Sequence, residues 1–464
     1  MFRVFLVLVL IVSLLAGGGW FWSGGRWDYF TNTSAPEISL SRAKGGNSKR
    51  FTVNLSAKDT FGLTALKVAV EQGGKTVELS NDAFNPALPS LSREIEIEPK
   101  KLELAEGTAK VIASAMNGTF SAKNSAAELS FLIDYSPPTV SVISQQFTAN
   151  QGGTELLLYR AGGGEITRTG VEIGDLFFRG YPGEAFDPKL ATQPGLYGAL
   201  IAMPLGFDST KTKITAVVED PSGNIAREIV TFPIKPLKQA DVNSKLSIGF
   251  LDAKLPTLSE SFENRTGERL SETLESANEK IERFRLINER YRGLLQQEMF
   301  SLINNSEPKK LWSGVFSRPI PGSTTSLFGE RRAYSLDGAA AGGSLHEGLD
   351  LASVKNDIVR AVNSGVVKFA GEFGIYGETV IIDHGLGLFS LYGHLSSIAV
   401  QTDASVSQDQ EIGRTGTSGL AGGDHLHFEF RVGHVSVNPI EWWDQKWITD
   451  NIDGKITAVL EPAR

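Results

Sequence analysis

The hydrophobic pattern of this chain changes its period twice, and that change restricts the possible folds more than any other feature of the sequence. From residue 36 to about 235, short apolar and polar positions alternate between turn residues, which predicts β-strands. From Ser259 to about Asn304, apolar residues recur at alternating steps of four and three, which predicts an α-helix. From Leu311 to about Trp443 the strand pattern returns, with frequent glycine. Because 464 residues also exceed what one core can hold, we expect a multidomain, mainly β protein.

The N-terminal segment carries an uncharged apolar run from Val4 to Ala16, which continues through glycines to Trp22. As a helix, residues 4–22 would measure about 28 Å, close to the roughly 30 Å of a bilayer core. We therefore expect residues 1–30 to be a membrane anchor, with a cleaved signal peptide as the alternative. The first reading predicts a single-pass inner-membrane protein with its bulk in the periplasm, and the second predicts a secreted protein.

The first strand-rich region is divided by Pro137-Pro138 into two pieces of about 100 residues each, the size of a β-sandwich. The sequence therefore predicts two modules similar to immunoglobulin-like sandwiches, at residues 31–136 and 137–237. Spacers that carry the rest of the chain away from the membrane are the favoured interpretation of both modules.

Residues 238–308 are predicted to form a helical linker with one apolar seam. The seam comprises Leu270, Leu274, Ala277, Ile281, Phe284, Asn288, Tyr291 and Leu295. A seam of this kind must pack on another surface. Packing within the chain is the favoured interpretation, and self-association through the 259–304 helix is the alternative.

The composition excludes several kinds of site. There is no cysteine, so disulfides, thiolate zinc sites and cysteine nucleophiles are excluded. A formal net charge of -8 argues against nucleic-acid binding. All six histidines lie in the last third of the chain, in a predicted domain at 309–445 that is followed by a tail at 446–464. Their clustering makes that domain the candidate for chemistry.

The segment from Asp424 to Arg431 reads as a strand with one polar face. Alternation places His425, His427 and Glu429 on that face, and the apolar residues between them on the other. Two imidazoles on one face can serve one metal site. An H-x-H pattern alone is also common among surface histidines.

A second segment runs from His346 to Asp350 and reads as a loop that enters a strand. Histidine and carboxylate donors suit zinc, and three protein ligands leave the open position of a catalytic site. Non-haem iron oxygenases use a similar donor set and are the competing enzyme class.

A third segment, from Ser390 to Leu395, is predicted to place Tyr392 and His394 on one strand face. The two remaining histidines, His384 and His434, are predicted to lie in turns, facing solvent and dispensable for function.

Together these segments resemble the lysostaphin-type (LytM-like) zinc peptidoglycan endopeptidases over residues 311–443. The motifs that carry the resemblance are Phe328-Gly329, H-x-G-x-D at 346–350, V-x-x-D-H-G at 380–385, Y-x-H-L at 392–395, T-G-x-S-G at 415–419, H-L-H-F-E at 425–429 and Val437-Asn438-Pro439. One departure lies at 352–358, where many members have A-P-x-G-T-P. That difference changes a turn and removes no ligand.

The resemblance implies an antiparallel-β zinc peptidase domain in which His346, Asp350 and His427 bind Zn2+. It further implies that His394 and His425 flank the metal as catalytic partners. Tyr392 and Glu429 are candidates for a supporting role, with a structural role as the favoured interpretation of each. The implied activity is hydrolysis of the peptide cross-links between peptidoglycan stems. The alternative is a non-catalytic wall-binding or hydrolase-activating protein, against which the five filled positions argue.

Overall fold

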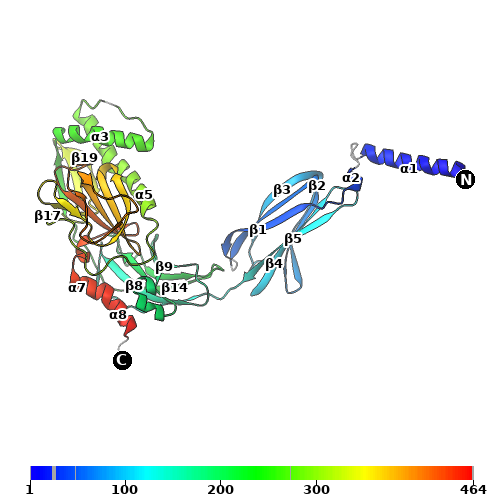
Figure 1. Cartoon of the computed structure of the whole chain (residues 1–464), viewed down its shortest axis with the longest axis horizontal. Helices are drawn as coiled ribbons and strands as arrows, with labels where there is room; N and C mark the ends of the chain where they lie inside the picture. The colour runs from blue at the N-terminus through cyan, green and yellow to red at the C-terminus, as the bar shows by residue number, and fades with distance from the viewer. Residues whose placement is uncertain (1, 23–27, 47–48, 272, 462–464) are drawn as a thin grey trace. The chain divides into compact units, whose positions relative to one another are not determined.

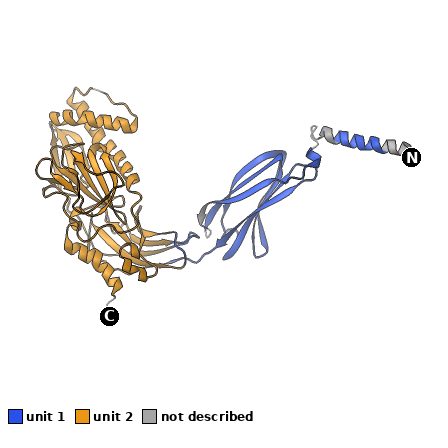
Figure 2. Cartoon of the chain, viewed as in Figure 1, with its two compact units in different colours: residues 1–138, 164–167, 219–225 blue, residues 139–163, 168–218, 226–464 orange. Residues whose placement is uncertain are grey.

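The computed structural model describes residues 2–22, 28–46, 49–271 and 273–461 of the chain. It contains two compact units, coloured separately in Figure 2. The first comprises residues 1–138 with the short segments 164–167 and 219–225, and the second comprises the remainder. The finer division of the chain into six segments stays a prediction.

The chain starts with helix α1 (Phe2–Trp22), followed by the short α2 (Asp28–Thr31). Within the described residues, no helix combines the length and the hydropathy that crossing a membrane demands. The membrane-spanning helix expected at the N-terminus is therefore not supported. Residues 1 and 23–27 of that expected segment lie outside the described residues.

The first unit contains one five-stranded sheet with the order β1-β2-β4-β5, in which β3 also pairs with β2. The strands are β1 (Glu37–Gly46), β2 (Arg50–Gln72), β3 (Lys75–Ile97), β4 (Gly107–Asn117) and β5 (Asn124–Ile133). Alternate β2 residues such as Val53 and Leu55 are fully buried and form the core with Val111 of β4. This single sheet does not confirm an immunoglobulin-like module.

The second unit begins with two four-stranded sheets, ordered β11-β12-β8-β6 and β10-β9-β13-β14. Their strands are β6 (Thr139–Val142), β8 (Thr154–Gly162), β9 (Arg168–Ile173), β10 (Leu176–Arg179), β11 (Tyr181–Pro182), β12 (Leu196–Ala202), β13 (Ile214–Glu219) and β14 (Ile225–Val230). Two sheets are present here, but the immunoglobulin-like topology is not confirmed.

The helical region consists of α3 (Ile248–Thr266), α4 (Ala277–Arg285), a π-helical turn (Leu286–Tyr291) and α5 (Arg292–Ile303). The expected continuous helix over 259–304 is thus wrong between α3 and α4. Gly267 ends α3 in a left-handed conformation with φ 73°, and Ser276 starts α4 with a capping box. The apolar period does not report capping residues, so it did not show that one helix ends at Gly267 and the next begins at Ser276.

The apolar seam on α4 and α5 packs within the chain, as favoured from the sequence. Ile281, Phe284 and Leu295 are buried in one cluster with Phe373 and Leu391 of the C-terminal domain. Figure 1 shows α3 and α5 beside the strands of that domain.

The C-terminal domain is built on an eight-stranded antiparallel sheet, ordered β17-β20-β28-β24-β23-β22-β26 with β29 paired to β28. Its strands are β17 (Ser323–Ser326), β20 (Leu349–Ala352), β22 (Gly365–Glu372), β23 (Glu378–Gly385), β24 (Leu388–Leu395), β26 (Ser405–Val406), β28 (Leu426–Val432) and β29 (Val435–Val437). Small sheets flank it, formed by β16 (Asp241–Leu246), β18 (Arg331–Leu336) and β19 (Ala339–Leu345), and by β21 (Ile358–Arg360), β25 (Ser397–Ile398) and β27 (Glu411–Arg414).

The chain ends in α6 (Pro439–Trp442), α7 (Gln445–Ile448), a π-helical turn (Thr449–Asp453) and α8 (Gly454–Leu460). Lys455 of α8 forms a buried ion pair with Glu155 of β8, and both side chains are only 2% exposed. The second β region, the helical region and the C-terminal domain therefore belong to one compact unit.

Candidate metal centre

Strand β28 carries the polar face that its alternation predicts. Phe428 and Phe430 point into the domain core, where Phe430 packs on Trp442, whereas His427 and Glu429 point to the other side of the sheet. Asp350 lies directly opposite His427 in the antiparallel pair β20–β28. Because paired residues project from the same face, the register brings the carboxylate to the imidazole.

His346 reaches the same point from the turn between β19 and β20. Gly348 allows this close approach, since a Cβ atom there would lie 2.4 Å from the Phe428 carbonyl oxygen and 3.0 Å from the His427 ring. The glycine of the H-x-G-x-D motif therefore lets the turn lie against β28.

The three donor atoms form a small triangle. The Asp350 Oδ1 atom lies 3.0 Å from His346 Nε2 and 2.9 Å from His427 Nδ1, and the two nitrogens are 3.1 Å apart. Each of the three residues therefore offers one ligand atom to a common point. Atoms at these separations can bind one ion at about 2.0–2.2 Å each, so the residues fit a zinc ion.

Each of the four imidazoles at the site has one ring nitrogen tied to the protein, which fixes the orientation of the other. The Nδ1–H groups of His346, His394 and His425 donate to the carbonyl oxygens of Leu327 (2.9 Å), Ser418 (2.9 Å) and Gly423 (2.8 Å), and Nε2–H of His427 donates to Glu429 Oε1 (2.9 Å). Of the remaining nitrogens, His346 Nε2 and His427 Nδ1 face Asp350 Oδ1, and all four are turned toward the point where a metal would bind.

His394 reaches the site through a break in the strand pattern. Glu378 pairs with Leu395 and Val380 pairs with Tyr392, so β24 has one residue more than β23 between these pairs. His394 itself has a left-handed backbone with φ 63°. This β-bulge re-aims the imidazole to the metal side, where its ring centroid is 5.8 Å from that of His427.

The prediction that Tyr392 and His394 share a face is therefore wrong. Tyr392 packs on Phe428 in the core, and its hydroxyl accepts the Val362 N–H at 3.0 Å. It does not reach the metal centre. The bulge was not visible in the sequence because Tyr392 and His394 fit simple alternation.

His425 completes the set. Its ring centroid lies 4.9 Å from that of His394, and its Nε2 atom lies 3.8 Å from Asp350 Oδ1. The structure thus brings all five predicted site residues together, and their roles stay predictions.

The charges around the donors set their protonation. Burial alone would raise the pKa of Asp350, but hydrogen bonds from His346 and His427 hold it well below its usual range. Burial likewise opposes the charged form of His427, yet Asp350 and Glu429 raise its pKa to about 9. The two carboxylates therefore favour positive charge at His427.

A buried chain of charges leads away from His427 to the helical region. Glu429 bridges His427 and Arg431, with Oε2 2.6 Å from Arg431 Nη1, and these contacts outweigh burial to lower its pKa to about 2. Arg431 lies 3.6 Å from Glu347, which accepts a hydrogen bond of 2.7 Å from Gln296 of α5. Helix α5 thus supports the network behind the donor His427.

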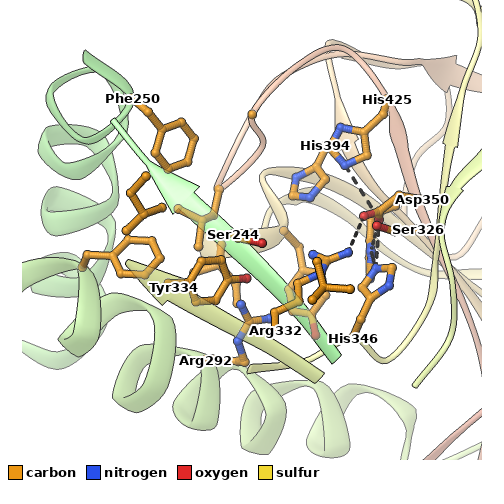
Figure 3. A pocket seen from close by; sticks show the side chains of 18 residues that line it. Ser244, Phe250, Arg292, Ser326, Arg332, Tyr334, His346, Asp350, His394 and His425 are labelled. Carbon is orange, nitrogen blue, oxygen red and sulfur yellow. Dashed lines mark hydrogen bonds and ion pairs between the residues drawn. The ribbon is translucent and has the colours of Figure 1, made fainter. Parts of the chain in front are cut away.

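The donors open into a cavity of about 310 Å³, shown in Figure 3. One wall carries His394, His425 and Asp350, and the other is formed by side chains from β16, α3 and β18, including Ser244, Phe250 and Tyr334. The cavity can therefore admit a substrate group next to the donors, with residues from outside the predicted domain along its wall.

Two further histidines behave differently from each other. His434 is exposed and stacks on Phe300, which agrees with its expected solvent-facing position. His384 was expected to face solvent, but it is fully buried, with Nδ1–H donating to the Ser364 carbonyl and Nε2 2.8 Å from Ser390 Oγ. The prediction was wrong because the sequence Asp383-His384-Gly385 indicates a turn, but not that Phe316 packs over the His384 ring.

Sequence reasoning missed the positively charged neighbour of the donors. Arg332 of β18 places its Nη2 atom 2.8 Å from Asp350 Oδ2. The only signal was Phe328-Gly329, which marks the segment but not the arginine. The contact of Arg431 with Glu429 was likewise not foreseen.

We next compared the chain with known protein families, sequences and solved structures. Residues 344–439 match peptidase family M23. The chain is 41% identical over 96 residues to DD-carboxypeptidase/endopeptidase Mpg of Neisseria meningitidis serogroup B, a match that covers 21% of this chain and 22% of that protein. It is 32% identical over 124 residues to murein hydrolase activator EnvC of Escherichia coli (strain K12), which covers 27% of this chain and 28% of that protein.

Among solved structures, a mutant catalytic domain of the prophage-encoded M23 protein EnpA from Enterococcus faecalis is 30% identical, with a TM-score of 0.23. The match covers 27% of this chain and 95% of that domain. The chain thus spans about a fifth to about a quarter of the curated relatives named here.

Proposed function

The C-terminal part of the chain belongs to peptidase family M23, of the LytM type, and from this premise we propose that the protein is a zinc-dependent endopeptidase that hydrolyses peptide cross-links of bacterial peptidoglycan. The observation that carries the proposal is the convergence of donor atoms from His346, Asp350 and His427, which lie 2.9–3.1 Å from one another with two further imidazoles beside them. Catalytic zinc sites have three protein ligands of this kind and one open position.

The three donors would hold the metal through His346 Nε2, His427 Nδ1 and Asp350 Oδ1. When bound, zinc supplies a Lewis acid for the amide carbonyl and makes hydroxide available near neutral pH. Iron remains the competing metal for two histidines and one carboxylate. The two additional histidines at this site have a role in hydrolysis and none in the iron chemistry, which supports zinc.

His394 and His425 would handle protons and developing charge. Burial, with His425 and His427 nearby, holds the pKa of His394 well below its usual range, so its free Nε2 is an acceptor at neutral pH. An acceptor next to the reacting water can take a proton and return it to the leaving amine. His425, with Nε2 turned to the same space, can share this task, and after it has accepted a proton there it can donate to the oxyanion.

We further propose that the protein works outside the cytoplasmic membrane, on the stem peptides of the wall. The uncharged apolar run at the N-terminus supports export.

The test is digestion of purified peptidoglycan by the zinc-loaded full chain, with the released peptides identified by mass spectrometry. We expect new free amino termini at cross-links, and none from the His394→Ala variant, which keeps the metal donors. No release by the wild-type protein would contradict the proposal.

A second candidate is an activator of other wall hydrolases, favoured by the similarity to EnvC, whose name states that role. The same digestion separates the two. An activator releases nothing alone but increases release by an added wall hydrolase, and it does so equally with His394→Ala.

A further inference from the structure

The short segment Leu327–Arg332 contacts two of the three donor residues. The Leu327 carbonyl accepts the Nδ1–H of His346, and the His346 backbone pairs with Gly329 and Glu330 through hydrogen bonds of 2.8 Å and 2.9 Å. Arg332, at the end of the segment, contacts Asp350. The whole segment lies before the family match at 344–439, so neither the match nor the sequence assigns it a role.

The two carboxylate oxygens of Asp350 have different partners: Arg332 contacts one, and the two histidine donors contact the other. Oδ1 faces His346 Nε2 at 3.0 Å and His427 Nδ1 at 2.9 Å, whereas Oδ2 accepts from Arg332 Nη2 at 2.8 Å. A guanidinium hydrogen bond to a carboxylate is strong and directional. The oxygen that it occupies is turned away from the point where the other donors meet.

Arg332 is itself held in place. Its side chain is only 21% exposed, and Glu330 Oε2 lies 3.6 Å from the same Nη2 atom that contacts Asp350. Glu330 is anchored in turn, because Oε1 accepts the Leu327 N–H at 2.7 Å. Its Oε2 is buried and has no hydrogen-bond partner among the described groups, so its charge is directed to Arg332.

A carboxylate can bind a metal through one oxygen or through both. Binding through both oxygens would fill a further coordination position, and a catalytic site needs an open one. Partners in the second layer around a metal fix the orientation of the ligands, and their loss typically costs about 10–100-fold in affinity or activity. Arg332 meets the geometric requirements for such a partner.

We propose that Arg332 is a positioning residue that holds Asp350 in a one-oxygen, metal-facing orientation and so preserves the open position at the site. The proposal rests on the metal site described under the proposed function, but it does not depend on which bond the protein cuts.

The test uses the full chain loaded with Co²⁺, whose visible absorption bands are intense with four ligands and weak with five or six. The variants are Arg332→Gln, Arg332→Lys and the control Arg331→Gln. Arg331 is the neighbour on β18 and forms an exposed ion pair with Asp241. Near-ultraviolet circular dichroism verifies the fold of each variant.

We expect Arg332→Gln to lose the intense bands, or to take up no Co²⁺ while remaining folded. Arg332→Lys should show part of the wild-type intensity, because lysine keeps the positive charge but lacks the planar guanidinium group. The control should match the wild type. In turnover assays, Arg332→Gln should lower kcat by about 10–100-fold with little change in KM.

An Arg332→Gln spectrum identical to that of the wild type would overturn the proposal, and an increase in KM alone would make Arg332 a substrate-binding residue instead. If Arg332→Gln does not fold, the Arg332→Lys spectrum decides, since a guanidinium role predicts only partial recovery. Failure of the peptidase proposal is a separate result: the wild type would then show the cobalt bands and release no peptides.

Discussion

The C-terminal sheet carries histidines on both of its faces, and the two sets are held in different ways. On one face His346 and His427 each tie one ring nitrogen to the protein and turn the other to Asp350. On the opposite face His384 uses both nitrogens, on Ser364 and Ser390. Burial does not separate them, because His346 and His427 are only 5% and 7% exposed and His384 is 0% exposed. A nitrogen left free toward a cavity is the feature that marks the chemical site.

The charges on the two faces reinforce this difference. Burial disfavours protonation of both histidines, but two carboxylates overcome it at His427, whose pKa is raised to about 9. No carboxylate contributes at His384, where burial lowers the pKa to about 4. One face is therefore built to hold a cation, and the other keeps its imidazole neutral as part of the core.

The largest effect is expected from His427→Ala, on the metal side. Removing one of three ligands should abolish zinc binding and reduce peptidase activity to background. Metal analysis and peptide release from purified wall material measure both. His434→Ala is the matched control, since His434 is exposed and stacks on Phe300. If His427→Ala kept stoichiometric zinc, the donor set would be wrong.

His394→Ala should give the next largest effect. The variant keeps all three donors, so zinc content should stay at the wild-type value, while kcat falls by about 10²–10⁴-fold with the loss of a proton acceptor. Equal loss of zinc in the His394 and His427 variants would contradict the division into ligands and catalytic partners.

Glu429→Gln should have an intermediate effect. The substitution weakens the partner of His427 Nε2 and removes the charged partner that lies 2.6 Å from Arg431 Nη1, and both His427 and Arg431 are buried. Zinc affinity, measured by competition with a chelator, should fall by about 10–100-fold. Glu282→Gln is the control, because Glu282 forms an exposed ion pair with Arg285. An unchanged affinity would remove the supporting role assigned to Glu429.

The smallest effect on activity is expected from His384→Phe, on the opposite face. The change leaves the Ser364 carbonyl and the Ser390 hydroxyl with fewer partners, so unfolding in denaturant should become easier by about 1–3 kcal/mol. Zinc content and kcat of the folded protein should not change. A variant that folds normally but loses zinc would contradict this separation and show that His384 also supports the metal site.

The lowered pKa of His384 predicts that the protein becomes less stable as the pH falls. Because the pKa of His384 is about 4 when folded and lies near 6.5 when unfolded, the unfolded chain takes up a proton first as the pH falls. This contribution is complete above pH 6.5 and is lost progressively between pH 6.5 and 4, by up to about 3 kcal/mol. Denaturation of wild type and His384→Phe at several pH values should show that the variant lacks this part of the decline.

The sequence predicted the metal side well and its surroundings poorly, for a physical reason. Strand alternation places His427 and Glu429 on one face, and the H-x-G-x-D turn adds His346 and Asp350. Both are local patterns. The bulge at His394 and the burial of His384 depend on pairing registers and on what packs above the sheet, as does the contact of Arg332 with Asp350. Such contacts join distant segments, and a single sequence does not record them.

The same limit applies to the fold. The apolar seam correctly indicated packing within the chain, because a buried face shows in the period of a helix. The break between α3 and α4 came from Gly267 and Ser276, end signals that were present but were outweighed by the period. Strand content was clear in the first unit, whereas the arrangement of those strands in one sheet follows from long-range pairing.

The central claim is that three side chains from separate segments hold one zinc ion, and anomalous diffraction at the zinc edge tests it most directly. Crystals of the full chain grown with zinc should show a peak about 2.0–2.2 Å from His346 Nε2, His427 Nδ1 and Asp350 Oδ1. A difference map without a peak at that point, or with zinc on other donors, would contradict the account.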